Sequence, residues 1–300
     1  MNLKPIIKHL LKKILTLKTM KTSNKLLIAL AISLILIPII VVAITVKMNY
    51  KTEKSIAVTR NTEKFSAPAE GYISTEISQS IKEIIIDDAK DFFLTIRIVK
   101  DIKSGVKIPE EYKDLLSFKV DDKGVLRFSL KMAKDEMNPS ARIIIYSPTV
   151  NLFSCTNGRG VYIRGNQDSL TLNTKAMHFL TIDSESTLNN LVVSADDVKE
   201  FLLDKAAVNN TEIKLKSSNF KTEAASFRSL KINATGTSNI EIDGDESKKD
   251  KYLIDDLSIK TEGKSSIDLT NIKVNKASGS LSDSTKVNMP VYVLKTMFKN

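Results

Sequence analysis

The stretch Leu170-Thr171-Leu172, Leu180-Thr181-Ile182, Leu191-Val192-Val193 and Phe201-Leu202-Leu203 decides the fold, because one short motif recurs in it. Each copy reads apolar–any–apolar, and the copies follow one another every ten to twelve residues. The same motif returns downstream as Ile213/Leu215, Leu230/Ile232, Ile240/Ile242, Leu257/Ile259, Ile267/Leu269 and Ile272/Val274. Such period-2 alternation predicts very short strands with one buried face. Strands this short bury that face when they stack on copies of themselves, so we expect an all-β, parallel β-helix-like solenoid.

An ordinary β-sandwich is the alternative, because it also has strands at a spacing of about 8–12 residues. Sandwich strands average about five or six residues, whereas these motifs predict strands of three or four. We therefore favour the solenoid. In it, Leu180, Ile182, Leu191, Val193, Ile240 and Ile242 should point inward, and Thr181, Val192 and Glu241 outward.

The chain before the repeats also reads as strands, beginning near Ile77. Residues 81–86 and 92–99 are rich in β-branched and aromatic side chains, with a turn between them at 87–91. Residues 101–113 resemble a loop, and residues 116–130 resemble a hairpin that turns at Asp121-Asp122-Lys123-Gly124. We expect the strands at 81–99 and this hairpin to cover the N-terminal end of the stack. At the other end, we expect the apolar segment from Met289 to Phe298 to lie across the last repeat as a cap, with Val291, Val293 or Leu294 buried and Pro290 blocking further strand addition.

One run, Leu26 to Val46, is predominantly apolar and carries no charge. At about 1.5 Å per residue, a helix of this length spans the roughly 30 Å hydrocarbon layer. We interpret it as an uncleaved transmembrane signal anchor; a cleaved signal peptide is the alternative, although its apolar core is usually about 7–15 residues long. The predicted order is a basic cytoplasmic segment (1–25), the anchor (26–46), a polar tether (47–75) and a β-solenoid ectodomain (76–300).

The charge of the chain agrees with this order. Nine lysines and no acidic residue lie in residues 1–51, so 9 of the net +10 belong to the N-terminus and the remainder of the chain carries only 10 − 9 = +1. A nucleic-acid reader needs a basic folded domain, so this class is excluded. The lysines before the run predict a cytoplasmic N-terminus and a periplasmic or otherwise extracytoplasmic C-terminal domain of an inner-membrane protein. Residues 1–19 fit an amphipathic helix on the membrane, unless translation starts at Met20.

Few residues suit catalysis or metal binding. The two histidines are His9, before the anchor, and His178, which we place at the edge or turn of a repeat. The single Cys155 should pack inward as a small apolar side chain. Gly158, Gly160 and Gly165 lack the spacing of a phosphate-binding loop and read as turn glycines between repeats.

Acidic residues are more numerous, and most lie in turn-like sequence. They include Asp183, Glu185, Asp196, Asp197, Asp243, Asp245, Glu246, Asp255 and Asp256. The segment Asp243-Gly244-Asp245-Glu246 resembles a fragment of a calcium loop but lacks the spacing to a terminal Glu. We assign no catalytic, cofactor-binding or metal-binding residue from the sequence.

The order of these segments resembles a known family. An N-terminal anchor precedes Ile81-Lys82-Glu83-Ile84-Ile85-Ile86, then come the hairpin around Asp121–Gly124, Ile143-Ile144-Ile145-Tyr146-Ser147-Pro148-Thr149-Val150, and repeats that contain Ser278-Gly279-Ser280. This order resembles the auto-transporter adhesin head family, or GIN domain, which is common in Bacteroidetes, over roughly residues 80–290. The chain departs from the pattern in having few glycines in its repeats and an anchor that reads as uncleaved. The resemblance implies an exported β-solenoid and carries over no site residues.

These observations predict a membrane-anchored, non-enzymatic solenoid that acts as a binding, adhesion-like or structural module of the cell envelope. Its expected partners are the membrane, through Leu26–Val46, and an unidentified envelope protein or glycan. One alternative is a β-helix enzyme acting on envelope polysaccharide, which needs carboxylates and a Lys or Arg together on one face of adjacent repeats. Another is the ectodomain of a signalling or regulatory complex. The low aromatic content, 6%, with no Trp, counts against a glycan-binding platform.

Overall fold

The computed structural model describes residues 22–24, 26–39, 42, 64–132, 139–248 and 251–298. The chain divides into two compact units, residues 1–61 and residues 62–300. The predicted amphipathic helix at 1–19 lies outside the described residues, as do the end of the predicted anchor at Val46 and residues 47–63 of the predicted tether.

The first unit contains one helix, Thr22–Ile39, that is long and apolar enough to cross a membrane. Most of its leucine and isoleucine side chains are exposed, for example Leu26 at 68% and Leu27 at 71%. An apolar helix that is not covered by the protein is suited to a lipid environment, although a signal sequence has the same properties.

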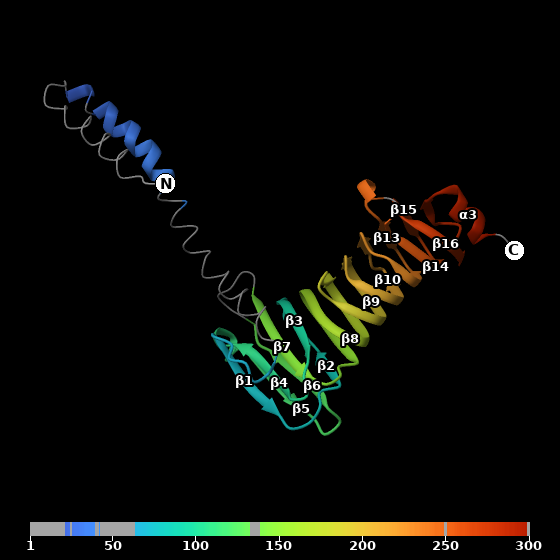
Figure 1. Cartoon of the computed structure of the whole chain (residues 1–300), viewed down its shortest axis with the longest axis horizontal. Coiled ribbons are helices and arrows are strands. Elements are labelled where there is room, and N and C mark those ends of the chain that lie inside the picture. Colours follow the sequence, from blue (N-terminus) through green and yellow to red (C-terminus); the bar gives the residue numbers. More distant parts are fainter. Residues whose placement is uncertain are drawn as a thin grey trace. The chain divides into compact units, whose positions relative to one another are not determined.

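The second unit is an all-β stack of parallel strands, which confirms the predicted fold class (Figure 1). Its repeating part comprises β8 (Leu152–Ile182), β9 (Thr187–Asp204), β10 (Ala207–Lys216), β11 (Phe220–Glu223), β12 (Phe227–Thr235), β13 (Ser238–Asp243), β14 (Leu253–Glu262), β15 (Ser265–Thr270), β16 (Lys273–Ser280) and β17 (Lys286–Asn288). All of these strands pair in parallel with the strand of the next turn.

One turn of the stack, which we call a rung, takes two copies of the sequence motif. Leu170 pairs with Leu191, and Leu180 pairs with Phe201, so each of these motifs pairs with the second motif after it in the sequence. We call the strand that contains the first copy the first strand of a rung and the next one the second strand. The first strands of successive rungs build one sheet, the first face, and the second strands build another, the second face. The expected ten-to-twelve-residue unit is therefore half a rung, and the strands are longer than the three or four residues expected.

Every apolar residue of the ten motif pairs is buried, at 6% exposure or less. Successive rungs superimpose like on like: Val193 of one rung lies between Leu172 and Ile213 of its neighbours. The predicted orientations hold, since Ile240 and Ile242 are buried whereas Glu241 is partly exposed. Stacking of the rungs therefore buries the apolar side chains that an isolated rung would expose to solvent.

The turn between first and second strand is made by one residue in the left-handed region. This residue is Asn157, Ala176, Asp197, Ser217, Gly236 and Gly263 in successive rungs. The interval between these corners is nearly constant up to Gly236, and the last interval is longer because it contains the 3-10 helix η3 (Glu246–Lys248). A single left-handed residue redirects the chain without ending the strand pairing. For this reason β8 and β9 each continue from one face of the stack to the other.

The N-terminal rungs are not laid down in sequence order. β2 (Glu83–Ile86) and β3 (Phe93–Lys100) form a rung that pairs on one side with β8 and on the other with β6 (Val125–Leu130) and β7 (Ser140–Ser147). The expectation that 81–99 covers the end of the stack is therefore wrong: this segment lies inside it. The turn at 87–91 and the hairpin of β5 (Leu116–Val120) with β6 are confirmed.

Antiparallel strands close this end instead. β5 pairs with β6, while β4 (Ser104–Pro109) pairs with β7 and then with β1 (Tyr72–Ile77). Residues 101–113, expected as a loop, thus contain a buried strand and the 3-10 helix η2 (Glu110–Tyr112). Strands also begin earlier than the expected Ile77, and Phe65 already packs edge-on against Tyr146 at 5.5 Å between ring centroids.

The other end is covered by a short helix, α3 (Val291–Met297), which packs against β16 (Figure 1). Val293 is buried, as expected for a C-terminal cap, and so is Met297. Val291 is 66% exposed, so of the three candidates that the sequence offered it is the one that points away. The tyrosine hydroxyl of Tyr292 accepts a hydrogen bond from the backbone N–H of Val274, at 3.2 Å.

Candidate functional site

The second face carries a row of aromatic side chains on neighbouring rungs. In β3, Leu94, Ile96 and Ile98 are buried, so alternation turns Phe93 and Arg97 outward. Phe93 pairs with Gly160 of β8, and the next residue in this row is Phe179, which is 44% exposed. The row therefore places two phenylalanines on either side of a glycine.

Gly160 is needed because the Phe93 ring lies over it. A Cβ at this position would stand 2.7 Å from ring carbons of Phe93 and 3.3 Å from the Cβ of Phe179. Gly158 is similar, since a Cβ there would meet Met177 at 2.9 Å. Gly160 and Gly165 occupy paired strand positions opposite Phe93 and Ile98, so the sequence-based interpretation of these two as turn glycines is wrong, whereas Gly158 directly follows the corner residue Asn157. They allow the close approach of neighbouring rungs.

The adjacent rows of the same face carry Tyr162 and two arginines. Tyr162 pairs with Thr95, and Arg164 pairs with Arg97. All four are partly exposed. We call Phe93, Arg97, Tyr162, Arg164 and Phe179 the front patch. Aromatic rings with guanidinium groups give a surface that can stack on flat or apolar groups and can donate hydrogen bonds to anions.

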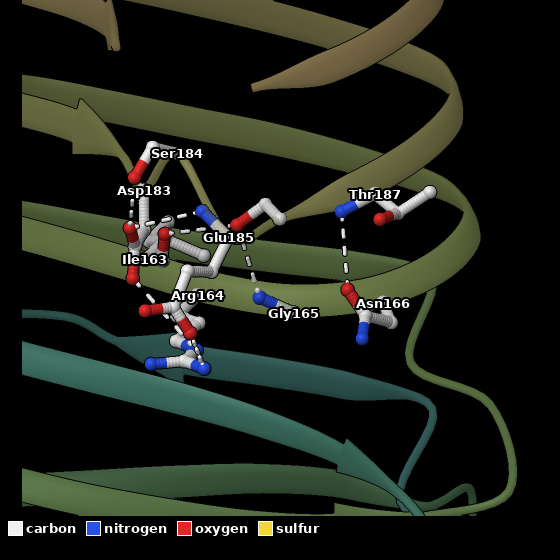
Figure 2. Close-up of polar contacts among 9 residues, drawn as sticks. Ile163, Arg164, Gly165, Asn166, Asp183, Ser184, Glu185 and Thr187 are labelled. Atoms are coloured by element: carbon white, nitrogen blue, oxygen red, sulfur yellow. Dashed lines mark hydrogen bonds and ion pairs between the residues drawn. The ribbon is translucent and has the colours of Figure 1, made fainter. Parts of the chain in front are cut away.

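At the edge of the front patch, Arg164 meets two carboxylates of the next rung (Figure 2). The backbone N–H of Asp183 donates to the Ile163 carbonyl at 2.8 Å, which sets Arg164 beside Asp183. The Arg164 Nε lies 3.8 Å from Asp183 Oδ2, and its Nη2 forms an ion pair with Glu185 Oε2. The sequence had flagged both acids but not the arginine that joins them.

Asp183 also organises its own turn. Its Oδ1 accepts hydrogen bonds from the Ser184 hydroxyl and the Glu185 backbone N–H, both at 3.1 Å. Its side chain is only 9% exposed. On the other side of the turn, Ser186 Oγ accepts from the Gly165 N–H at 3.2 Å, and Asn166 Oδ1 accepts from the Thr187 N–H at 3.1 Å (Figure 2).

This geometry limits the chemistry of the cluster. A pair of catalytic carboxylates has to flank the bond that it cleaves and reach the substrate from both sides. Here both acids contact the same guanidinium, and the buried Asp183 is engaged by the turn that follows it. The cluster fits a clamp between two rungs that holds Arg164 in place at the edge of the front patch.

The first face ends in two ladders of side-chain amides. Asn209 donates to Asn189 at 3.0 Å and Asn189 to Asp168 at 3.4 Å. Beside them, Asn210 donates to Asn190 at 3.0 Å and Asn190 to Ser169 at 3.2 Å. Identical side chains at the same place in successive rungs satisfy one another, as in other stacked strands.

The remaining acids flagged from the sequence are distributed over several rungs. Asp196 pairs with Lys216 at 3.2 Å, and Asp197 is a corner residue. Asp255 accepts from Asn275 at 2.9 Å. Asp255 and Asp256 together line a hollow of about 400 Å³ with Arg228 and Lys276 of the adjacent rungs. Apart from this pair, the structure does not gather the remaining carboxylates at one point.

The calcium-loop resemblance has a structural explanation. Asp243 accepts hydrogen bonds from Thr270 at 3.1 Å and Asn271 at 3.0 Å. Asp245 accepts from the N–H of Ser247 at 2.9 Å and starts η3, to which Glu246 belongs. Gly244 lies where a Cβ would stand 1.8 Å from the Asn271 carbonyl oxygen. The segment therefore fits the long rung, and no group of three His, Cys, Asp or Glu arranged for a metal is found in the described residues.

Histidine and cysteine, two residue types often used in catalysis, occupy different environments in the stack. His178 is exposed in β8, with its Nε2 3.3 Å from Lys199 Nζ, so it is a strand residue next to the Ala176 corner. Cys155 is fully buried and pairs with Ile86, which confirms its inward packing. Burial raises the pKa of its thiol to about 12, which keeps it protonated and unreactive.

Comparisons with known proteins give structural neighbours only. No family model matches the chain, and no curated protein matches it. Several crystal structures are similar over most of its length, among them the following three. A "putative adhesin" from Bacteroides fragilis is 20% identical and has a TM-score of 0.46, covering 74% of this chain and 99% of that one. A "putative lipid binding protein" from Parabacteroides distasonis is 13% identical (TM-score 0.39, 73% and 94% covered), and a "putative adhesin" from Parabacteroides merdae is 12% identical (0.33, 73% and 97%).

Similarity at this level does not transfer a function to the chain. Because no family model and no curated protein matches the chain, the family resemblance stays a prediction.

Proposed function

We propose that the chain is a membrane-anchored, non-enzymatic solenoid of the cell envelope that acts as a binding, adhesion-like or structural module. In this proposal Leu26–Val46 anchors the protein in the inner membrane with a cytoplasmic N-terminus, and the stack faces the periplasm or the exterior. The observation that carries the binding role is the front patch, since aromatic rings and guanidinium groups are concentrated on neighbouring rungs of one face.

The partner that this surface suits is an envelope protein or a glycan. Phe179 is 44% exposed, and Arg164 is oriented by Asp183 and Glu185. Both kinds of partner use aromatic stacking together with arginine hydrogen bonds. The low aromatic content of the whole chain counts against a glycan-binding surface. The front patch weakens that argument, because Phe93, Tyr162 and Phe179 lie together in it.

The test is capture of partners from crosslinked membranes by the full chain with its anchor in place. The variants Phe179→Ser and Tyr162→Ser should reduce the amount of the captured partner. Ile102→Ser is the matched control, because Ile102 is 95% exposed and lies outside the front patch. If the front-patch variants and the control capture equal amounts, the front patch is not the binding surface.

The enzyme alternative is tested separately with Asp183→Asn and Glu185→Gln. If envelope polysaccharide is depolymerised by the purified chain, and either substitution abolishes this without lowering the unfolding temperature, the cluster is catalytic. We expect no depolymerisation, and we expect both substitutions to lower stability through loss of the clamp to Arg164.

A further inference from the structure

The end of the stack that α3 covers combines exposed apolar side chains with lysines. Val291 is 66% exposed, Tyr292 48%, Phe298 54% and Val287 of the last strand 36%. These four lie on β17 or on the cap helix and the residue after it. Exposed large apolar residues gathered at one end of a folded unit mark a contact surface.

Around these residues the chain is basic, although the rest of the folded unit is not. Residues 273–298 contain four lysines and one acid, a net charge of +3. Residues 62–272 contain 29 Lys and Arg against 33 Asp and Glu, a net charge of −4. The four lysines, Lys273, Lys276, Lys286 and Lys295, are all exposed, although Lys276 shares its hollow with Asp255 and Asp256 of β14. We call this end, residues 273–298, the basic tip.

The cap uses the Tyr292 hydroxyl, which accepts the Val274 N–H, but it does not need the side chains of Val291 and Phe298. Val293 and Met297, one helical turn apart, are buried against the last rung, and Met289 is buried beside them. Val291 and Phe298 are therefore left on the outer side of the cap. Closing the stack accounts for the buried residues and leaves the exposed ones unexplained.

We propose that the basic tip is a contact surface for a bilayer that contains anionic lipids. Phosphate groups of the lipids complement the lysines, and the side chains of Val291, Tyr292 and Phe298 enter the boundary between headgroups and acyl chains. Tyrosine and phenylalanine beside lysine are the residues that proteins place at this boundary. Charge complementarity decides for a lipid surface, because the tip is the positive end of a domain whose remainder is negative.

The experiment uses the full chain, inserted through its anchor into sucrose-loaded vesicles of phosphatidylcholine. Fluorescent acceptor vesicles are made either of phosphatidylcholine alone or of equal parts phosphatidylcholine and phosphatidylglycerol. We expect the protein-bearing vesicles to sediment the anionic acceptors and not the neutral ones, and we expect added salt to reduce the effect.

Two variants separate the contributions of the tip. Lys286→Gln with Lys295→Gln should weaken capture by about fivefold per lysine. Val291→Ser with Phe298→Ser should weaken it as well, without changing the unfolding temperature, since both side chains are exposed. Ile102→Ser removes an exposed apolar residue elsewhere and should leave capture unchanged.

Three results would overturn the proposal. One is the absence of capture, or equal capture of neutral and anionic acceptors. Another is undiminished capture by both tip variants. The third is clustering of the protein-bearing vesicles among themselves without capture of acceptors, which would make the tip a contact between two copies of the chain. Because the front patch lies on other rungs, none of these results depends on the outcome of the partner-capture experiment.

Discussion

Val192 and Val193 are adjacent valines, and the stack buries the side chain of Val193 but leaves that of Val192 partly exposed. Val193 is fully buried between Leu172 and Ile213, whereas Val192 is partly exposed on the outer side of β9. The substitution to Ala therefore removes the same two methyl groups from the core in one variant and from the surface in the other.

The expected costs follow from burial. Two buried methyl groups are worth about 1.6 kcal/mol of transfer free energy, and the cavity left between two rungs adds a further contribution. We expect Val193→Ala to lower the free energy of unfolding by about 2–3 kcal/mol. For a unit of this size that corresponds to a decrease of roughly 4–12 °C in the unfolding temperature. Val192→Ala should change the free energy by about 0.5 kcal/mol or less.

The assay is denaturant and thermal unfolding of residues 62–300, which contain one continuous hydrophobic core of their own. Equal losses for the two variants would refute the idea that burial alternates along this strand. A larger loss for Val192→Ala would mean that the register is inverted, because a shift by one residue exchanges the two faces of a strand.

The remaining predictions concern the two ends, the pH response and the topology. Deleting residues 289–300 removes the cap with Val293 and Met297, so light scattering should show self-association of the truncated unit; a monomer of unchanged stability would mean that α3 is no cap. Asp101 Oδ2 accepts the Phe65 N–H, which holds the pKa of this carboxyl below its usual range. The stabilisation is thus present above the unfolded value of about 3.9 and lost as the pH falls through the lowered folded value. The protection factor of the Phe65 N–H, which is the exchange rate of an unstructured peptide at the same pH divided by the observed rate, should fall on acidification in the wild type and change little with pH in Asp101→Asn; equal pH profiles would refute this. A reporter active only outside the cytoplasm, fused after Asn300, should be active, and the reverse would exclude the proposed orientation.

The inward rows of the solenoid could be predicted from the sequence because each residue reports its own environment. An apolar side chain in a period-2 motif needs burial whatever lies beside it, so the motif pairs were found without knowledge of the rung. The pair formed by Phe220 and Thr222 was missed for the same reason: both are buried, at 1% each, but threonine does not read as apolar. The second half of that rung thus disappeared from the pattern.

The candidate site was less accessible, because it depends on which residues become neighbours across rungs. Arg164 and Asp183 are separated in the sequence by about one rung. That separation carries no meaning until the rung length is known, and the motif repeat suggested half of it. The front patch is hidden in the same way, since Phe93 and Gly160 are brought together only by the out-of-order insertion of β3 beside β8.

The C-terminal cap shows a case in which burial was predicted and conformation was not. The segment from Pro290 to Leu294 is rich in β-branched residues and reads as a strand. Pro290 instead precedes the helix, a position at which its missing N–H is no loss, and Val293 and Met297 then face the core at helical spacing. Tertiary packing on the last rung outweighs local strand propensity here.

Stacking also explains why one fold can hold two separate surfaces. Each rung contacts only its neighbours, so side chains on β3 and β8 are separated from those on β16 and α3 by the intervening rungs. A change on the front patch therefore alters its own rung and the two beside it, and it leaves the cap at the other end intact. The outward residues of each rung are free to vary as long as the inward rows are apolar, which permits a basic tip on a domain that is otherwise negative.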